Sequence, residues 1–177
     1  ILISTSIGLA IAFTTYSPED PSFVYGDRDF EIKNFFGIYG SSIADFLLQS
    51  FGLVSFLILA NFLFWGINLI IQKGIKKIIL KLFLMVSYLI LGSIFIYITF
   101  NNSFWLIDNG NSGFVGKIGY KFISTWFPWI DNNYSSYGLL LSTLVFFFLS
   151  ADLDFKQILI TIFSLLKRKE KGEKFYN

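Results

Sequence analysis

Four apolar runs separated by short charged segments constrain this chain more than any other feature. The two central runs, Phe46–Ile71 and Ile79–Phe100, each exceed twenty residues with hardly a charge. Such a run can cross a hydrocarbon core of about 30 Å with some tilt. Ile1–Tyr16 and Tyr137–Ala151 are shorter, and the first reaches only about 24 Å as a helix. We predict an all-α membrane protein with four transmembrane helices and short interfacial amphipathic helices.

The composition agrees with a membrane class and excludes several kinds of chemistry. Hydrophobic residues make up 54% of the chain, whereas soluble domains contain about 45–50%. Cysteine and histidine are absent, which excludes disulfides, thiol nucleophiles and imidazole ligands. No G-x-x-x-x-G-K-[S/T] loop occurs, so we expect no catalytic residue, cofactor or metal site in this piece. The chain begins at Ile1 inside an apolar run, so we expect an excised piece with a truncated first helix.

The positions of lysine and arginine predict the orientation. Ten of the fourteen basic residues lie between the second and third runs, at the start of the third run or after the fourth, and the two sides of the membrane come to +6 and −4. Cytoplasmic loops carry the excess of Lys and Arg, so both termini are predicted to be cytoplasmic in a bacterial inner membrane. Lys81, at the cytoplasmic end of the third run, is expected to snorkel to the head groups.

These observations divide the chain into nine segments. They are transmembrane helix 1 (1–16), a periplasmic loop (17–45), transmembrane helix 2 (46–71), a cytoplasmic loop (72–78), transmembrane helix 3 (79–100), a periplasmic loop (101–136) with an interfacial helix near 114–126, transmembrane helix 4 (137–151), a cytoplasmic-side amphipathic helix (152–166) and the start of a basic cytoplasmic linker (167–177).

Two stretches have the spacing of helices that lie on a membrane surface. One places Val115, Ile118, Phe122 and Trp126 three and four residues apart, and the other, Leu153–Leu166, carries a single polar stripe. The basic residues of 167–174 are expected to set topology and to bind anionic lipid head groups.

Three motifs and one polar pair stand out from the apolar background. A proline-containing turn ends the first run and consists of Tyr16, Ser17, Pro18, Asp20, Pro21, Ser22 and Phe23. The approach to the second run carries Asn34, Gly37, Gly40, Ala44, Asp45, Leu47, Phe51 and Gly52, where the glycine pair favours close helix packing. The third motif is Gly113, Gly116 and Gly119, followed by Gly138 at the start of the fourth run. Asn61 and Asn68 share a helix face and predict either interhelical hydrogen bonds or a polar permeation path.

The motifs, taken in order, resemble the amino-terminal four-helix membrane domain of the FtsK/SpoIIIE family of bacterial DNA translocases. The resemblance implies a role in cell division and chromosome partition, with this domain anchored at the division septum beside other division proteins. It also implies a hexameric ATPase beyond Asn177, where ATP, Mg²⁺ and DNA would bind. No binding site can be transferred to the membrane motifs, which have no assigned chemistry.

Two other readings remain open at the level of sequence. A small transporter or channel would need polar groups at mid-membrane, and only Asn61 and Asn68 offer any. The chain could also be the membrane anchor of an unrelated sensor.

Overall fold

The computed structural model describes residues 1–22, 32–71, 74–102, 105–106 and 108–153, and within them every regular element is a helix. The predicted all-helical class is thereby confirmed. The elements are α1 (Leu2–Thr14), α2 (Gly37–Phe51), the 3₁₀ turn η1 (Gly52–Ser55), α3 (Phe56–Ile70), α4 (Ile78–Phe100), α5 (Gly113–Trp126), the 3₁₀ turn η2 (Pro128–Asp131) and α6 (Asn133–Ala151).

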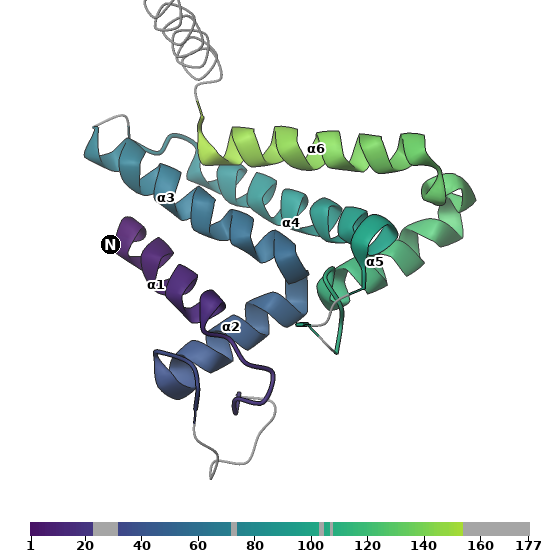
Figure 1. The fold of residues 1–177 in the computed structure, drawn as a ribbon. Coiled ribbons are helices and arrows are strands. Elements are labelled where there is room, and N and C mark those ends of the chain that lie inside the picture. The colour runs from purple at the N-terminus through teal and green to yellow at the C-terminus, as the bar shows by residue number, and fades with distance from the viewer. Residues whose placement is uncertain (23–31, 72–73, 103–104, 107, 154–177) are drawn as a thin grey trace, which may run out of the picture.

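The long helices form a bundle with two different ends (Figure 1). Helices α3, α4 and α6 pack together, and α1 lies against α3. One end, here called the lysine end, holds the start of α1 and the segment 74–81 together with Asp152. The opposite end, called the loop end, holds α2, α5, η2 and the segments 15–22, 32–36 and 108–112.

Two apolar clusters fill the interior. Phe13 and Leu48 centre the first cluster, where α1 meets α2, and Tyr88 and Phe147 centre the second, between α4 and α6. Tyr88 and Phe147 meet edge to face with ring centroids 5.5 Å apart, an arrangement that adds to the apolar burial.

Three helical stretches are long and apolar enough to cross a membrane: Gly37–Ile70, Ile78–Phe100 and Asn133–Ala151. The remaining predicted span, residues 1–16, corresponds to α1, which has 13 residues and therefore reaches about 20 Å.

The second predicted span differs from the structure. We expected a loop up to residue 45 and one helix over 46–71, but helix α2 already begins at Gly37 and the chain turns sharply between α2 and α3 (Figure 1). Gly52 makes this bend with φ 60° and ψ −141°, a conformation essentially restricted to glycine. Together η1 and α3 reach about 30 Å, which matches a hydrocarbon core.

The last helix also begins earlier than predicted. The Asn132 side chain accepts a hydrogen bond from the Tyr134 N–H at 3.3 Å and so caps α6 at Asn133 rather than near Tyr137. The chain leaves α6 through Asp152, which is left-handed at φ 59°. The predicted amphipathic helix at 152–166 and the basic linker lie outside the described residues from 154 onward.

Candidate functional site

The proline-containing turn after α1 is joined to the start of α2 through Asp20. One carboxylate oxygen of Asp20 accepts the Lys33 N–H at 2.9 Å, and the other accepts the Asn34 N–H at 2.8 Å. The Asp20 residue is only 8% exposed. Because the acceptor is charged and largely buried, each of these hydrogen bonds stabilises the turn more than a neutral pair does.

Asn34 extends this connection to both neighbouring helices. Its amide nitrogen donates to the Ala12 carbonyl at 2.9 Å near the end of α1, and its amide oxygen accepts the Phe36 N–H at 3.2 Å before α2. A Cβ at Gly40 would lie 2.1 Å from that oxygen, whereas nothing lies within 4 Å of a Cβ at Gly37. The predicted use of this glycine pair in helix–helix packing is therefore wrong, since Gly40 makes room for the Asn34 side chain.

A second polar chain crosses the loop end from Tyr16. The Tyr16 hydroxyl donates to Asp45 at 3.0 Å and accepts from Gln49 at 3.1 Å, and the Gln49 oxygen accepts from Asn109 at 2.8 Å. A phenol is protonated at neutral pH, so the Tyr16 hydroxyl can donate to the Asp45 carboxylate. Asp45 thus connects α2 to the segment after α1.

The third motif packs backbone against backbone on the second. A Cβ at Gly52 would lie 1.9 Å from the Asn111 carbonyl oxygen, and one at Gly113 would lie 2.4 Å from the Ser50 carbonyl oxygen. A Cβ at Gly116 would lie 2.4 Å from the Ser93 carbonyl oxygen on α4. Only glycine permits such approaches, so α5 is held against α2 and α4.

The remaining motif residues occupy less connected positions. Ala44 is fully buried. The backbone carbonyls of Leu47, Phe51 and Pro21 accept hydrogen bonds from the hydroxyls of Ser55, Ser93 and Ser41, respectively. A Cβ at Gly119 would meet the Ile94 side chain. Nothing lies within 4 Å of a Cβ at Gly138. Ser17 accepts a long hydrogen bond from the Glu19 N–H, Pro18 and Ser22 lie in the same turn, and Phe23 lies outside the described residues.

The sequence did not predict the polar contacts at the lysine end. The Lys81 ammonium lies 2.5 Å from the Asp152 carboxylate, as an ion pair rather than a well-directed hydrogen bond, and the Lys81 side chain is only 8% exposed. The Ser150 hydroxyl donates to the Lys81 carbonyl at 2.9 Å, and the Trp65 indole donates to the Ser150 carbonyl at 2.7 Å. The prediction that Lys81 snorkels is wrong, because its ammonium turns inward and joins α4 to the end of α6.

We expect Asp152→Ala to destabilise the bundle more than Lys81→Met does. The first change leaves an ammonium buried without its counter-ion, which costs about 3–5 kcal/mol in fully buried pairs and less here because Asp152 is 45% exposed. The second removes the buried charge and keeps an apolar stem of similar length. Thermal unfolding in detergent measures both variants, and equal destabilisation would contradict the inward-facing ion pair.

The asparagine pair of α3 divides into two different environments. Asn68 donates to the Asp152 carbonyl at 3.5 Å, near the limit of a hydrogen bond. Asn61 is fully buried, and neither of its side-chain polar atoms has a hydrogen-bond partner among the described residues. The two residues therefore form no continuous polar stripe in this part of the chain.

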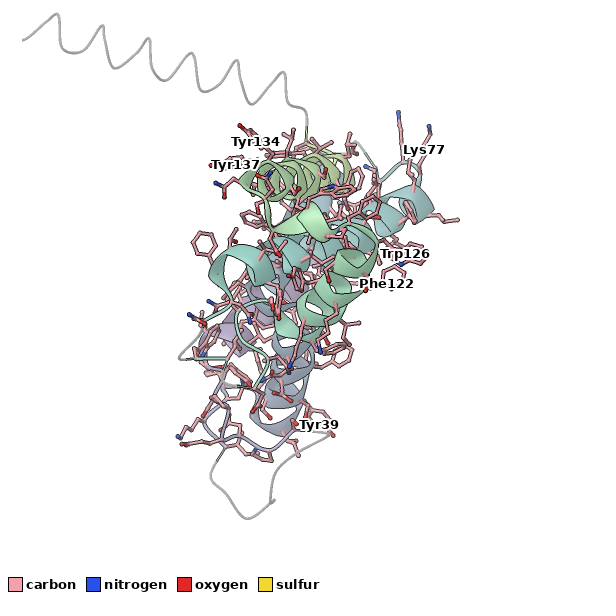
Figure 2. The ribbon with its side chains drawn as sticks, turned by 90° about the vertical axis from the view of Figure 1, so that its right-hand side faces the viewer. Tyr39, Lys77, Phe122, Trp126, Tyr134 and Tyr137 are labelled. Atoms are coloured by element: carbon pink, nitrogen blue, oxygen red, sulfur yellow. The ribbon has the colours of Figure 1, made fainter. Side chains whose placement is uncertain are left out.

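Helix α5 presents one aromatic and aliphatic stripe away from the bundle. Phe114, Ile118, Phe122 and Trp126 recur every four residues and are all exposed, Trp126 to 70%. Phe122 and Trp126 are labelled in Figure 2, where both project from α5. The stripe begins at Phe114 rather than at the expected Val115, because Gly113 and Gly116 turn the opposite face onto α2 and α4.

The described contacts at both ends hold helices together. Among the described residues no group of three or more His, Cys, Asp or Glu side chains could hold a metal ion. Asp20, the carboxylate with the firmest hydrogen bonds at the loop end, is occupied by backbone N–H groups.

Comparison with known proteins decides the family. A model of the 4TM region of DNA translocase FtsK/SpoIIIE matches residues 1–163. The chain belongs to this family. It is therefore a membrane-embedded domain of a DNA translocase family, and the resemblance seen in the motifs is confirmed.

Curated relatives agree with this membership. The chain is 35% identical over 69 residues to DNA translocase FtsK of Azospirillum brasilense, a match that covers 38% of this chain and 11% of the relative. It is 39% identical over 75 residues to the Rickettsia bellii protein of that name (41% and 10%) and 42% identical over 64 residues to that of Rickettsia prowazekii (35% and 8%). The matched part is thus about a tenth of each relative. No solved structure matches.

Proposed function

We propose that this chain is the membrane anchor and division-site assembly domain of a cell-division DNA translocase that acts in chromosome segregation and cytokinesis. The observation that carries the proposal is the convergence of three family motifs at one end of the bundle. Asp20 and Asn34 join the first two motifs, and Gly52 and Gly113 join the second to the third. A rigid, sequence-encoded surface at one membrane face suits recognition of other division proteins.

The two ends of the bundle support the predicted orientation. Among the described residues, the lysine end carries Lys76, Lys77 and Lys81 with one carboxylate, Asp152. The loop end carries three lysines beside a larger number of carboxylates, namely Glu19, Asp20, Asp45, Asp108 and Asp131. Because basic residues mark the cytoplasmic side, we place the lysine end in the cytoplasm and the loop end in the periplasm of the bacterial inner membrane. Both termini then lie in the cytoplasm.

A motor beyond residue 177 completes the proposal. Relatives are named DNA translocases, so we assign ATP, Mg²⁺, DNA binding and a hexameric state to that downstream part. The described residues contribute attachment and positioning, and no step of nucleotide chemistry is assigned to them.

Localisation of a fluorescently tagged chain tests this function. We expect residues 1–177 to collect at the division septum, and we expect the Asn61→Leu/Asn68→Leu variant to localise equally well because neither asparagine lies at the loop end. A transporter or channel that used these side chains would instead lose activity in that variant. Uniform distribution of the wild-type chain around the cell membrane would overturn the proposed role.

A further inference from the structure

An open groove runs along the start of α4 at the lysine end. It is open over most of its extent, has a volume of about 710 Å³ and is lined by Ile75, Lys77, Ile78, Ile79, Leu80 and Phe83. All six lining residues belong to the segment 75–83, so no other described element closes the groove.

The rim of this groove carries an uncompensated positive charge. Lys76 and Lys77 are both exposed, and neither forms an ion pair with any residue that the structure describes. The sequence contains no Asp or Glu between Asp45 and Asp108. Asp152, the described carboxylate at this end, is paired with Lys81. Figure 2 shows the Lys77 side chain extending away from the helices.

The walls of the groove suit a hydrocarbon chain better than a peptide. Apart from the lysine, the lining side chains are aliphatic or aromatic, so they offer a peptide backbone almost no hydrogen-bond partner and would leave its polar groups unsatisfied. The same apolar surface continues along α4 through the exposed Val86 and Ile90. In a membrane-embedded chain, that flank faces lipid.

We propose that this groove binds one anionic phospholipid, with its phosphate between Lys76 and Lys77 and an acyl chain along Ile78, Ile79 and Phe83. Basic groups beside membrane-spanning helices attract anionic head groups, and each lysine near the surface strengthens binding about fivefold. The site rests on the proposed placement of the lysine end at the cytoplasmic leaflet. It would fix the depth and tilt of α4 next to the ion pair that joins α4 to α6.

Native mass spectrometry of the purified chain from mixed micelles of phosphatidylglycerol and phosphatidylcholine tests the headgroup contact. We expect the wild type to retain phosphatidylglycerol preferentially, and we expect Lys76→Gln/Lys77→Gln to weaken that binding roughly 25-fold without changing phosphatidylcholine binding. The matched control is Lys117→Gln/Lys121→Gln, which removes two exposed lysines from α5 at the other end and should leave retention unchanged. Equal losses in both double variants would overturn the site.

A second variant tests the groove itself. Ile79 is 81% exposed, so Ile79→Ser should fold normally while it weakens retention of both lipids severalfold, because it removes apolar contact area. The proposal would be overturned if Ile79→Ser retained both lipids as the wild type does. It would also be overturned if this substitution removed a protein dimer, and not a bound lipid, from the mass spectrum. Both faces of the protein meet the same lipids in a micelle, so a negative result would leave the orientation and the septal role untouched.

Discussion

Gly52→Ala is expected to cost the bundle on the order of 3–5 kcal/mol and to detach α5 from α2. The native φ of 60° with ψ −141° is strained for alanine by about 1–3 kcal/mol. The new Cβ would also lie 1.9 Å from the Asn111 carbonyl oxygen, so the backbone of the segment 108–112 must move. That movement breaks the hydrogen bond from the Leu53 N–H to the same oxygen, which is 2.9 Å long.

Thermal unfolding in detergent, followed by circular dichroism, measures this loss. The matched control is Gly138→Ala in α6, where the backbone is helical and nothing lies within 4 Å of the added Cβ. Alanine there should stabilise the helix by about 0.4–1 kcal/mol. If the free energy of unfolding of Gly52→Ala lay within 1 kcal/mol of the wild-type value, the close packing of the second motif on the third would be contradicted.

The all-helical membrane class could be predicted from the sequence because a bilayer imposes a minimum apolar length. The bend between α2 and α3 could not be predicted in this way. The apolar run passes through Gly52 without a charge or proline, and a single glycine inside a helical pattern is a weak signal. The early start of α2 could not be predicted for a related reason, since Ser41 donates to the Pro21 carbonyl and Asp45 accepts from Tyr16.

The motifs could be recognised from the sequence, but not the way in which they combine. Asp20 and Asn34 meet across fourteen positions through a side chain and a backbone N–H group, a contact that leaves no periodic trace. The burial of Lys81 depends on Asp152, 71 residues away. Neither residue differs locally from an ordinary lysine or aspartate at a helix end, so only the packing of α4 against α6 reveals the pair.

Asp20→Ala should have the second large effect, a loss of about 2–5 kcal/mol. The substitution leaves the Lys33 and Asn34 N–H groups without their acceptor, and an unsatisfied buried donor costs about 1–3 kcal/mol. The displaced Asn34 would then lose its contact with Ala12, which connects the turn to α1. Asp20→Asn should lose about half as much, because its amide oxygen can still accept one of the two hydrogen bonds.

The neighbouring Glu19→Gln provides the matched control. Glu19 accepts a hydrogen bond from Lys33 that lowers the pKa of its carboxyl, yet both side chains are mostly exposed and water screens the pair. Whatever that pair contributes is present above the ordinary pKa of Glu19 and is lost as the pH falls through the lowered pKa. At neutral pH and moderate salt, unfolding of Glu19→Gln should match the wild type. If Glu19→Gln and Asp20→Ala were equally destabilised, general charge in the turn, and not the two backbone hydrogen bonds of Asp20, would hold the first motif to the second.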